Sequence, residues 1–134
     1  STLYLHILLI LEKEEEKLSD NIRILVFEGM FHEGQRHGPG IWRNCDGHEY
    51  CGMWEFGLRS GWGILICNNG EKYEGQWKDG KFHGLGKLES SNGDSYVGHF
   101  VNGKYDGICI FRKKDQSCFV GYSKGGIAEG MGVL

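Results

Sequence analysis

The stretch from Tyr73 to Ser95, YEGQWKDGKFHGLGKLESSNGDS, decides the fold because its pattern recurs along the whole chain. Five positions of a 23-residue period hold 22 of the 23 glycines, and only Gly125 lies outside them. A fixed period of this length indicates a repeat architecture, in which each unit packs on its neighbours. We number the positions of the repeat from the aromatic residue that begins each row: Phe27, Tyr50, Tyr73, Tyr96 and Phe119.

Each repeat contains two extended segments. In the first, residues 73–77 place an aromatic residue, a glycine and a second aromatic residue on one face of a strand. A glycine between two large rings leaves a notch that a neighbouring ring can enter, which explains a residue that otherwise weakens a strand. In the second segment, positions 12, 14 and 16 present glycine, glycine and a large apolar residue on one face.

Turn signals separate these segments. Asn-Gly and Asp-Gly dipeptides tolerate positive φ and favour tight hairpins. They occur at Asp46-Gly47, Asn69-Gly70, Asp79-Gly80, Asn92-Gly93 and Asn102-Gly103. The sequence therefore predicts a mainly β protein, with one elongated antiparallel sheet of stacked hairpins over residues 27–134. Two strands spaced about 4.8 Å apart advance such an array by roughly 10 Å per repeat.

The N-terminal segment does not follow the repeat. LYLHILLILEKEEEKL, residues 3–18, has no Gly or Pro and changes from apolar to charged along its length. We expect an α-helix here, within a segment and linker covering residues 1–26. The apolar strand at Trp62, Ile64 and Ile66 needs a cover on its second face, either from this helix or from a partner.

Composition excludes some classes of function. The net charge is −3, and Arg112, Lys113 and Lys114 form the single basic run, so we expect no nucleic-acid partner. The five cysteines contain no CxxC pair, which favours a reducing, cytoplasmic compartment over a disulfide framework. The apolar run at residues 3–11 is too short to span a bilayer.

Two motifs could carry chemistry, and neither is convincing. Residues 121–125, GYSKG, match the nucleophile elbow of hydrolases, but no helix pattern follows them. A zinc site would need four converging ligands from His32, His37, Cys45, His48 and Cys51. His37 shares its repeat position with His83, and the last three candidates stand around a turn. We therefore expect no enzyme activity, no metal and no cofactor.

The sequence at 73–86, YEGQWKDGKFHGLG, resembles the membrane occupation and recognition nexus (MORN) repeat. The resemblance covers residues 27–134, as four full repeats and a partial fifth. It implies a groove or platform for partner proteins, often cytoskeletal or at membrane–cytoskeleton junctions, and phospholipid binding is also attributed to the family. The fifth row departs from the pattern, because Ser123 stands where the second aromatic residue belongs, and the fourth row lacks two glycines, at Cys109 and Gln116.

We therefore predict a non-catalytic scaffold that presents an aromatic-lined β-platform to a partner protein, such as a helical segment. The alternative is a peripheral phospholipid-binding module that brings an attached domain to the membrane, although the net charge of −3 provides no basic face for it. The open final hairpin predicts self-association or continuation into further repeats. The predicted partner-binding residues are Tyr50, Trp54, Trp62, Tyr73, Trp77, Tyr96 and Phe100.

Overall fold

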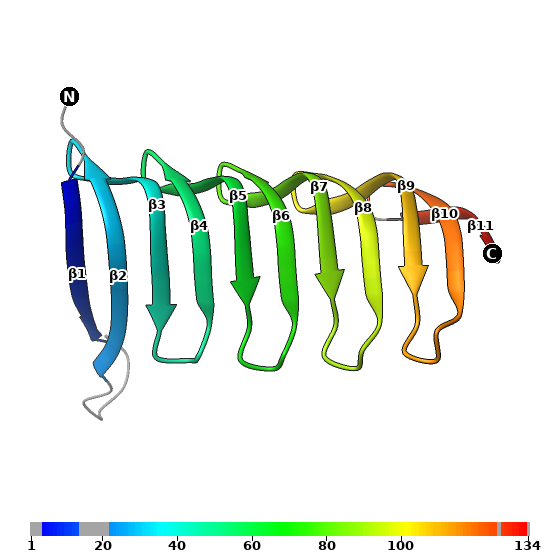
Figure 1. Ribbon diagram of the computed structural model, residues 1–134, viewed down its shortest axis with the longest axis horizontal. Coiled ribbons are helices and arrows are strands. Elements are labelled where there is room, and N and C mark those ends of the chain that lie inside the picture. Colours follow the sequence, from blue (N-terminus) through cyan, green and yellow to red (C-terminus); the bar gives the residue numbers. More distant parts are fainter. Residues whose placement is uncertain (1–3, 14–21, 126, 134) are drawn as a thin grey trace.

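A computed structural model describes residues 4–13, 22–125 and 127–133. They form one 11-stranded antiparallel sheet in which every strand pairs with its neighbours in sequence, and no helix occurs in the described ranges. Figure 1 shows an elongated array with the strands across its long axis. The strands are β1 (Tyr4–Lys13), β2 (Ile22–His32), β3 (Gln35–Asn44), β4 (Glu49–Glu55), β5 (Leu58–Ile66), β6 (Lys72–Lys78), β7 (Lys81–Glu89), β8 (Ser95–Val101), β9 (Lys104–Arg112), β10 (Cys118–Lys124) and β11 (Ile127–Val133). The predicted sheet of consecutive hairpins is confirmed.

The N-terminal segment adds a strand to the sheet. Over Tyr4–Lys13 the structure has strand β1, paired with β2 along its full length. The helix was predicted over residues 3–18, a range that extends beyond this strand at both ends. Residues 3 and 14–18 of the expected helix lie outside the described residues. A short apolar run does not distinguish a buried strand from a helix by periodicity, and the free edge of β2 supplies the backbone partners that a strand needs. β1 thus extends the edge of the sheet.

A glycine bulge recurs in every complete repeat. Between β2 and β3 the register passes from Gly29↔Gly40 to Phe31↔Arg36, so that residues 37–39 of β3 lie opposite Met30 alone. Gly38, in the middle of this bulge, has φ 89°, a conformation that favours glycine. Bulges bend a strand and increase its twist. The strands accordingly curve at the same level along the array (Figure 1).

The core is a double row of rings on one face of the sheet. The Tyr50 hydroxyl donates a hydrogen bond to the Met53 carbonyl at 2.8 Å, and Trp54 Nε1 donates one to the Gly40 carbonyl at 3.3 Å. A Cβ on Gly63, at position 14, would collide with the Tyr50 ring and hydroxyl, so this glycine forms the notch for the ring. The sequence predicts the notch at position 3 instead, where a Cβ on Gly52 would first meet the backbone of Gly63 on the neighbouring strand. Tyr73 and Trp77 repeat both hydrogen bonds one repeat later.

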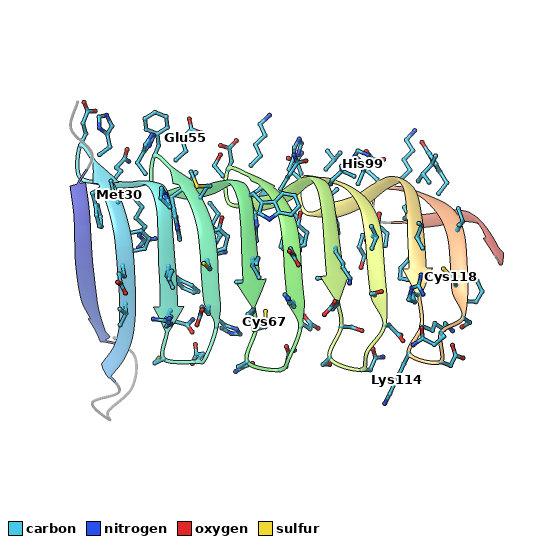
Figure 2. All side chains as sticks on the ribbon, in the orientation of Figure 1. Met30, Glu55, Cys67, His99, Lys114 and Cys118 are labelled. Carbon is cyan, nitrogen blue, oxygen red and sulfur yellow. The ribbon has the colours of Figure 1, made fainter. Side chains whose placement is uncertain are left out.

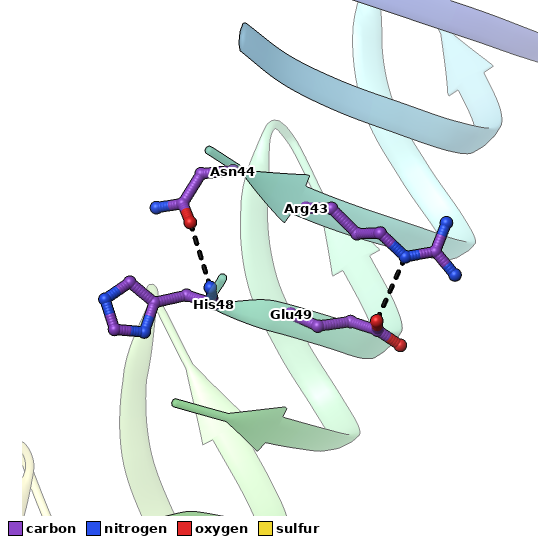
Figure 3. Close-up of polar contacts among 4 residues, drawn as sticks. All are labelled: Arg43, Asn44, His48 and Glu49. Carbon is purple, nitrogen blue, oxygen red and sulfur yellow. Dashed lines mark hydrogen bonds and ion pairs between the residues drawn. The ribbon is translucent and has the colours of Figure 1, made fainter. Parts of the chain in front are cut away.

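The turns that join β3 to β4 and β5 to β6 are linked by hydrogen bonds. Within the β3–β4 turn, the Asn44 side chain accepts a hydrogen bond from the His48 backbone at 3.0 Å, and Arg43 pairs with Glu49 at 3.0 Å (Figure 3). The next turn is tied to this one, because Asn68 Nδ2 donates a hydrogen bond to the Asp46 carbonyl at 2.8 Å. These links fix the spacing between successive repeats.

Candidate partner-binding site

The two faces of the sheet differ in what they offer a partner. The aromatic face carries positions 1, 5, 10 and 16 of the repeat, and its innermost side chains are buried. The open face is the opposite one, and large apolar side chains between 40% and 68% exposed lie along it. They come from six of the strands, β4, β5, β7, β8, β9 and β10: Met53, Trp62, Ile66, Leu85, Val97, Ile108, Ile110 and Tyr122.

Six of the seven predicted partner-binding residues lie in the aromatic core and are between 0% and 5% exposed: Tyr50, Trp54, Tyr73, Trp77, Tyr96 and Phe100. They pack edge-to-face in a continuous series, with Tyr50 5.1 Å from Trp54 and 5.2 Å from Trp77 between ring centroids. Their packing holds successive repeats in register. A partner on this face therefore meets mainly the side chains that lie over them.

Positions 10 and 16 supply those covering side chains, all half-buried: Arg36, Arg59, Phe82 and Tyr105 at position 10, and Trp42, Leu65, Leu88 and Phe111 at position 16. The Phe82 ring stacks on Tyr73 with a centroid distance of 3.8 Å, and Tyr105 stacks on Tyr96 at 4.0 Å. Sequence reasoning missed position 10. The spacing could have revealed it. Position 10 lies two residues before the glycine at position 12 and an even number of residues before positions 14 and 16, so a regular strand places it on their face.

Trp62 is the predicted residue that the structure exposes. It is 54% exposed and separates two hollows on the sheet. The larger has a volume of about 600 Å³, with Met30, Pro39, Ile41, Cys51 and Met53 in its lining. The smaller, about 300 Å³, lies between Trp62 and His83. Met30 marks the N-terminal end of this region beside β2 (Figure 2). An exposed tryptophan between two hollows is of the kind that anchors protein interfaces.

The charges on the open face are largely paired. Lys87 Nζ lies 3.0 Å from a Glu89 oxygen, and Lys72 Nζ lies 4.0 Å from a Glu74 oxygen. Glu74 and Lys87 are also direct partners across β6 and β7. Exposed pairs of this kind contribute little to stability, but they leave no strong field of either sign here. The open face therefore presents mainly apolar side chains to its surroundings.

The chemical motifs remain without a reaction. Ser123 of the GYSKG sequence lies inside β10, is fully buried and contacts the Cys109 sulfur at 3.8 Å. Among the described residues, no group of three or more His, Cys, Asp or Glu side chains converges as a metal site. All five cysteines are free, and Cys45 and Cys51 are exposed. In the described ranges, no helix has the length and apolar character needed to cross a membrane.

Comparison with known families agrees with this geometry. The model of the MORN repeat matches four consecutive units, residues 27–49, 50–72, 73–95 and 96–118. The chain belongs to the MORN repeat family. MORN repeats generally bind proteins or lipids and are not known as catalytic modules. No curated protein matches the chain.

Proposed function

We propose that this MORN protein is a non-catalytic scaffold that binds a partner protein on its open face, with Trp62 as the central contact. The observation that carries the proposal is the row of exposed apolar side chains across β4 to β10. Large apolar side chains that gather on one exposed face mark interaction sites. The aromatic face supports the proposal indirectly, because its interlocked rings make the sheet a firm platform.

An elongated helical partner fits the spacing of the array. Equivalent side chains on the open face recur about every 10 Å, the width of two strands. In an α-helix, residues seven apart lie on one side and are separated by about 10.5 Å along the axis. A helix along the array can therefore place one apolar residue against each repeat. Trp62, Leu85 and Ile108 occupy the same repeat position and would receive them.

The test compares two exposed aromatic residues. Trp62→Lys changes the open face, whereas Phe56→Lys changes a residue that is 61% exposed in the β4–β5 turn. Proteins captured by the intact chain are identified and purified, and their affinities for both variants are measured. We expect Trp62→Lys to weaken a true partner by about tenfold or more, with little effect of Phe56→Lys.

A different outcome would favour the lipid-binding alternative. If no protein depends on Trp62, and the chain instead sediments with anionic vesicles in a salt-sensitive manner, the lipid-binding alternative replaces the protein scaffold. Circular dichroism of each variant confirms that the sheet is intact. Trp62→Lys is suited to this comparison because the side chain is largely solvent-exposed, so its loss opens no core cavity.

A further inference from the structure

Two arginines interrupt the aromatic face at its N-terminal end. Arg36 and Arg59 occupy position 10, where the next repeats have rings. The guanidinium carbon of Arg36 lies 5.0 Å from the Trp54 ring, and that of Arg59 lies 6.0 Å from it. Arg59 also approaches the rings of Trp42 at 5.0 Å and Tyr50 at 5.1 Å. The two cations thus flank one tryptophan and are half-buried among rings.

No described acidic residue pairs with these two arginines. Within the part of the chain that the structure describes, neither guanidinium forms an ion pair, and Arg59 Nε is buried with no hydrogen-bond partner. Burial lowers the pKa of Arg59, and the positive charge of Arg36 lowers it further, against an opposing contribution from Tyr50. Contacts with aromatic faces offset only part of the cost of desolvating a cation. An anion bound next to the two arginines would offset the rest of this desolvation cost.

The repeat frame does not require arginine at this position. Phe82 and Tyr105 stand at the same position in the next repeats and stack on the tyrosine below them. A neutral ring therefore completes the aromatic face without a buried charge. The two guanidiniums are a local departure whose effect is to place positive charge on an otherwise apolar surface.

An apolar hollow adjoins Arg59. It has a volume of about 270 Å³ and is lined by Leu65, Trp77 and Phe82, with Lys81 also at its edge. A ligand with a carboxylate could pair with the Arg59 guanidinium, and an apolar side chain next to that carboxylate could fill the hollow. Arg36 and Arg59 are one repeat apart, about 10 Å, which again matches acidic residues seven apart on a helix.

We propose that the aromatic face of the first two repeats binds an acidic protein helix, with carboxylates on Arg36 and Arg59 and an adjacent apolar residue in the hollow. This site lies on the face opposite Trp62, so it goes beyond the proposed function, and either can fail alone. A membrane surface is the poorer fit. Lipid recognition relies on clusters of several basic residues, whereas this region adds Lys81 alone to the two arginines in a chain of net charge −3.

The experiment selects binders from a displayed library of helical peptides on the intact chain. The comparison protein carries Arg36→Phe and Arg59→Phe, the side chain that position 10 already has in the third repeat. We expect wild-type selections to be enriched in Asp or Glu seven residues apart. Peptides from them should lose about tenfold or more in affinity for the double variant, and less for Arg59→Lys, which keeps the charge without the planar fork.

Several outcomes would overturn the proposal. Selected peptides without acidic enrichment would do so, as would peptides that bind the double variant equally well. Arginine-dependent binding of phosphatidylserine vesicles without any acidic peptide would assign the site to lipid instead. The Trp62→Lys chain serves as the second control, because it should keep full affinity for these peptides even if it loses the partner of the open face. Thermal melting of each variant verifies the fold.

Discussion

At the scale of single residues, the aromatic face is built from rings that each pack over a glycine of the neighbouring strand. Trp54 lies over Gly40 and donates a hydrogen bond to its carbonyl, and Trp77 does the same over Gly63. Between the fourth and fifth repeats both members of this pair change. Cys109 takes the place of the glycine and Ser123 takes the place of the ring, and the two side chains are in contact at 3.8 Å. One departure from the repeat therefore compensates the other.

This pairing predicts a strong coupling between the two positions. Ser123→Trp alone should destabilise the fold by about 1–3 kcal/mol, because the indole would overlap the Cys109 side chain. Cys109→Gly made together with Ser123→Trp should recover much of that loss by restoring the pair found in the other repeats. Urea unfolding of the four proteins measures the coupling free energy. Additive effects of the two substitutions would show that the contact is not the reason for either residue.

Gln116 provides a second residue-scale prediction. It has φ 74° at the turn position where Gly47, Gly70 and Gly93 stand in the other repeats, although its backbone still donates the turn hydrogen bond to Lys113 at 2.9 Å. A side chain resists this conformation, so Gln116→Gly should stabilise the protein by about 0.4–1 kcal/mol. The midpoint of urea unfolding measures the change. Gly70→Gln is the converse control, and stabilisation by both substitutions would contradict the argument.

Individual elements were predicted with unequal success, for physical reasons. The hairpins could be predicted because turn chemistry and ring alternation act within a few residues. The β1 strand could not, because an apolar run does not reveal whether it meets a sheet edge or folds on itself. The burial of Tyr50 and Trp54 also depends on tertiary packing: the sequence identified their face but not the covering role of Arg36 and Arg59. Trp62 stood out in the sequence because it makes its strand apolar on both faces, and its role in binding stays a prediction.

The β4–β5 hairpin carries an element-scale prediction. Its two central turn residues, Phe56 and Gly57, have φ 49° and 81°, as Asp79-Gly80 and Asn102-Gly103 do in later turns with φ near these values. Phenylalanine is a poor residue for this conformation, whereas Asn and Asp tolerate it. Phe56→Asn should therefore raise the free energy of unfolding by about 0.5–1 kcal/mol. The Phe56 ring also packs edge-to-face on His37, with centroids 5.3 Å apart. A loss in thermal stability would show that this contact outweighs the backbone strain.

At the scale of the whole molecule, the buried tyrosines link stability to alkaline pH. Burial raises the pKa of Tyr73 to about 12 from its ordinary value near 10, and burial also raises the pKa values of Tyr50 and Tyr96. A raised pKa means that the folded state resists ionisation. The stability from these groups is complete below pH 10 and is lost as the pH rises through the folded values.

We therefore expect the free energy of unfolding to fall from about pH 10 upward, with unfolding and tyrosine ionisation in a shared transition. Tyr73→Phe should make this decline shallower, because it removes one of the linked groups. Phe27 already occupies position 1 without a hydroxyl, so the ring itself is tolerated. Tyrosine absorbance and circular dichroism follow the two processes. Ionisation of all tyrosines near pH 10 in a folded protein would contradict their burial.

In the proposed scaffold, the open face of the whole array is the surface that binds the partner protein. The most direct measurement places a photo-reactive amino acid at Trp62 and, in a second protein, at Phe56, and identifies what each captures in the source cells. We predict that the residue at position 62 captures one protein reproducibly, and that position 56 captures it far less. Equal capture at both positions, or capture of lipid alone at position 62, would contradict a protein-binding platform on this face.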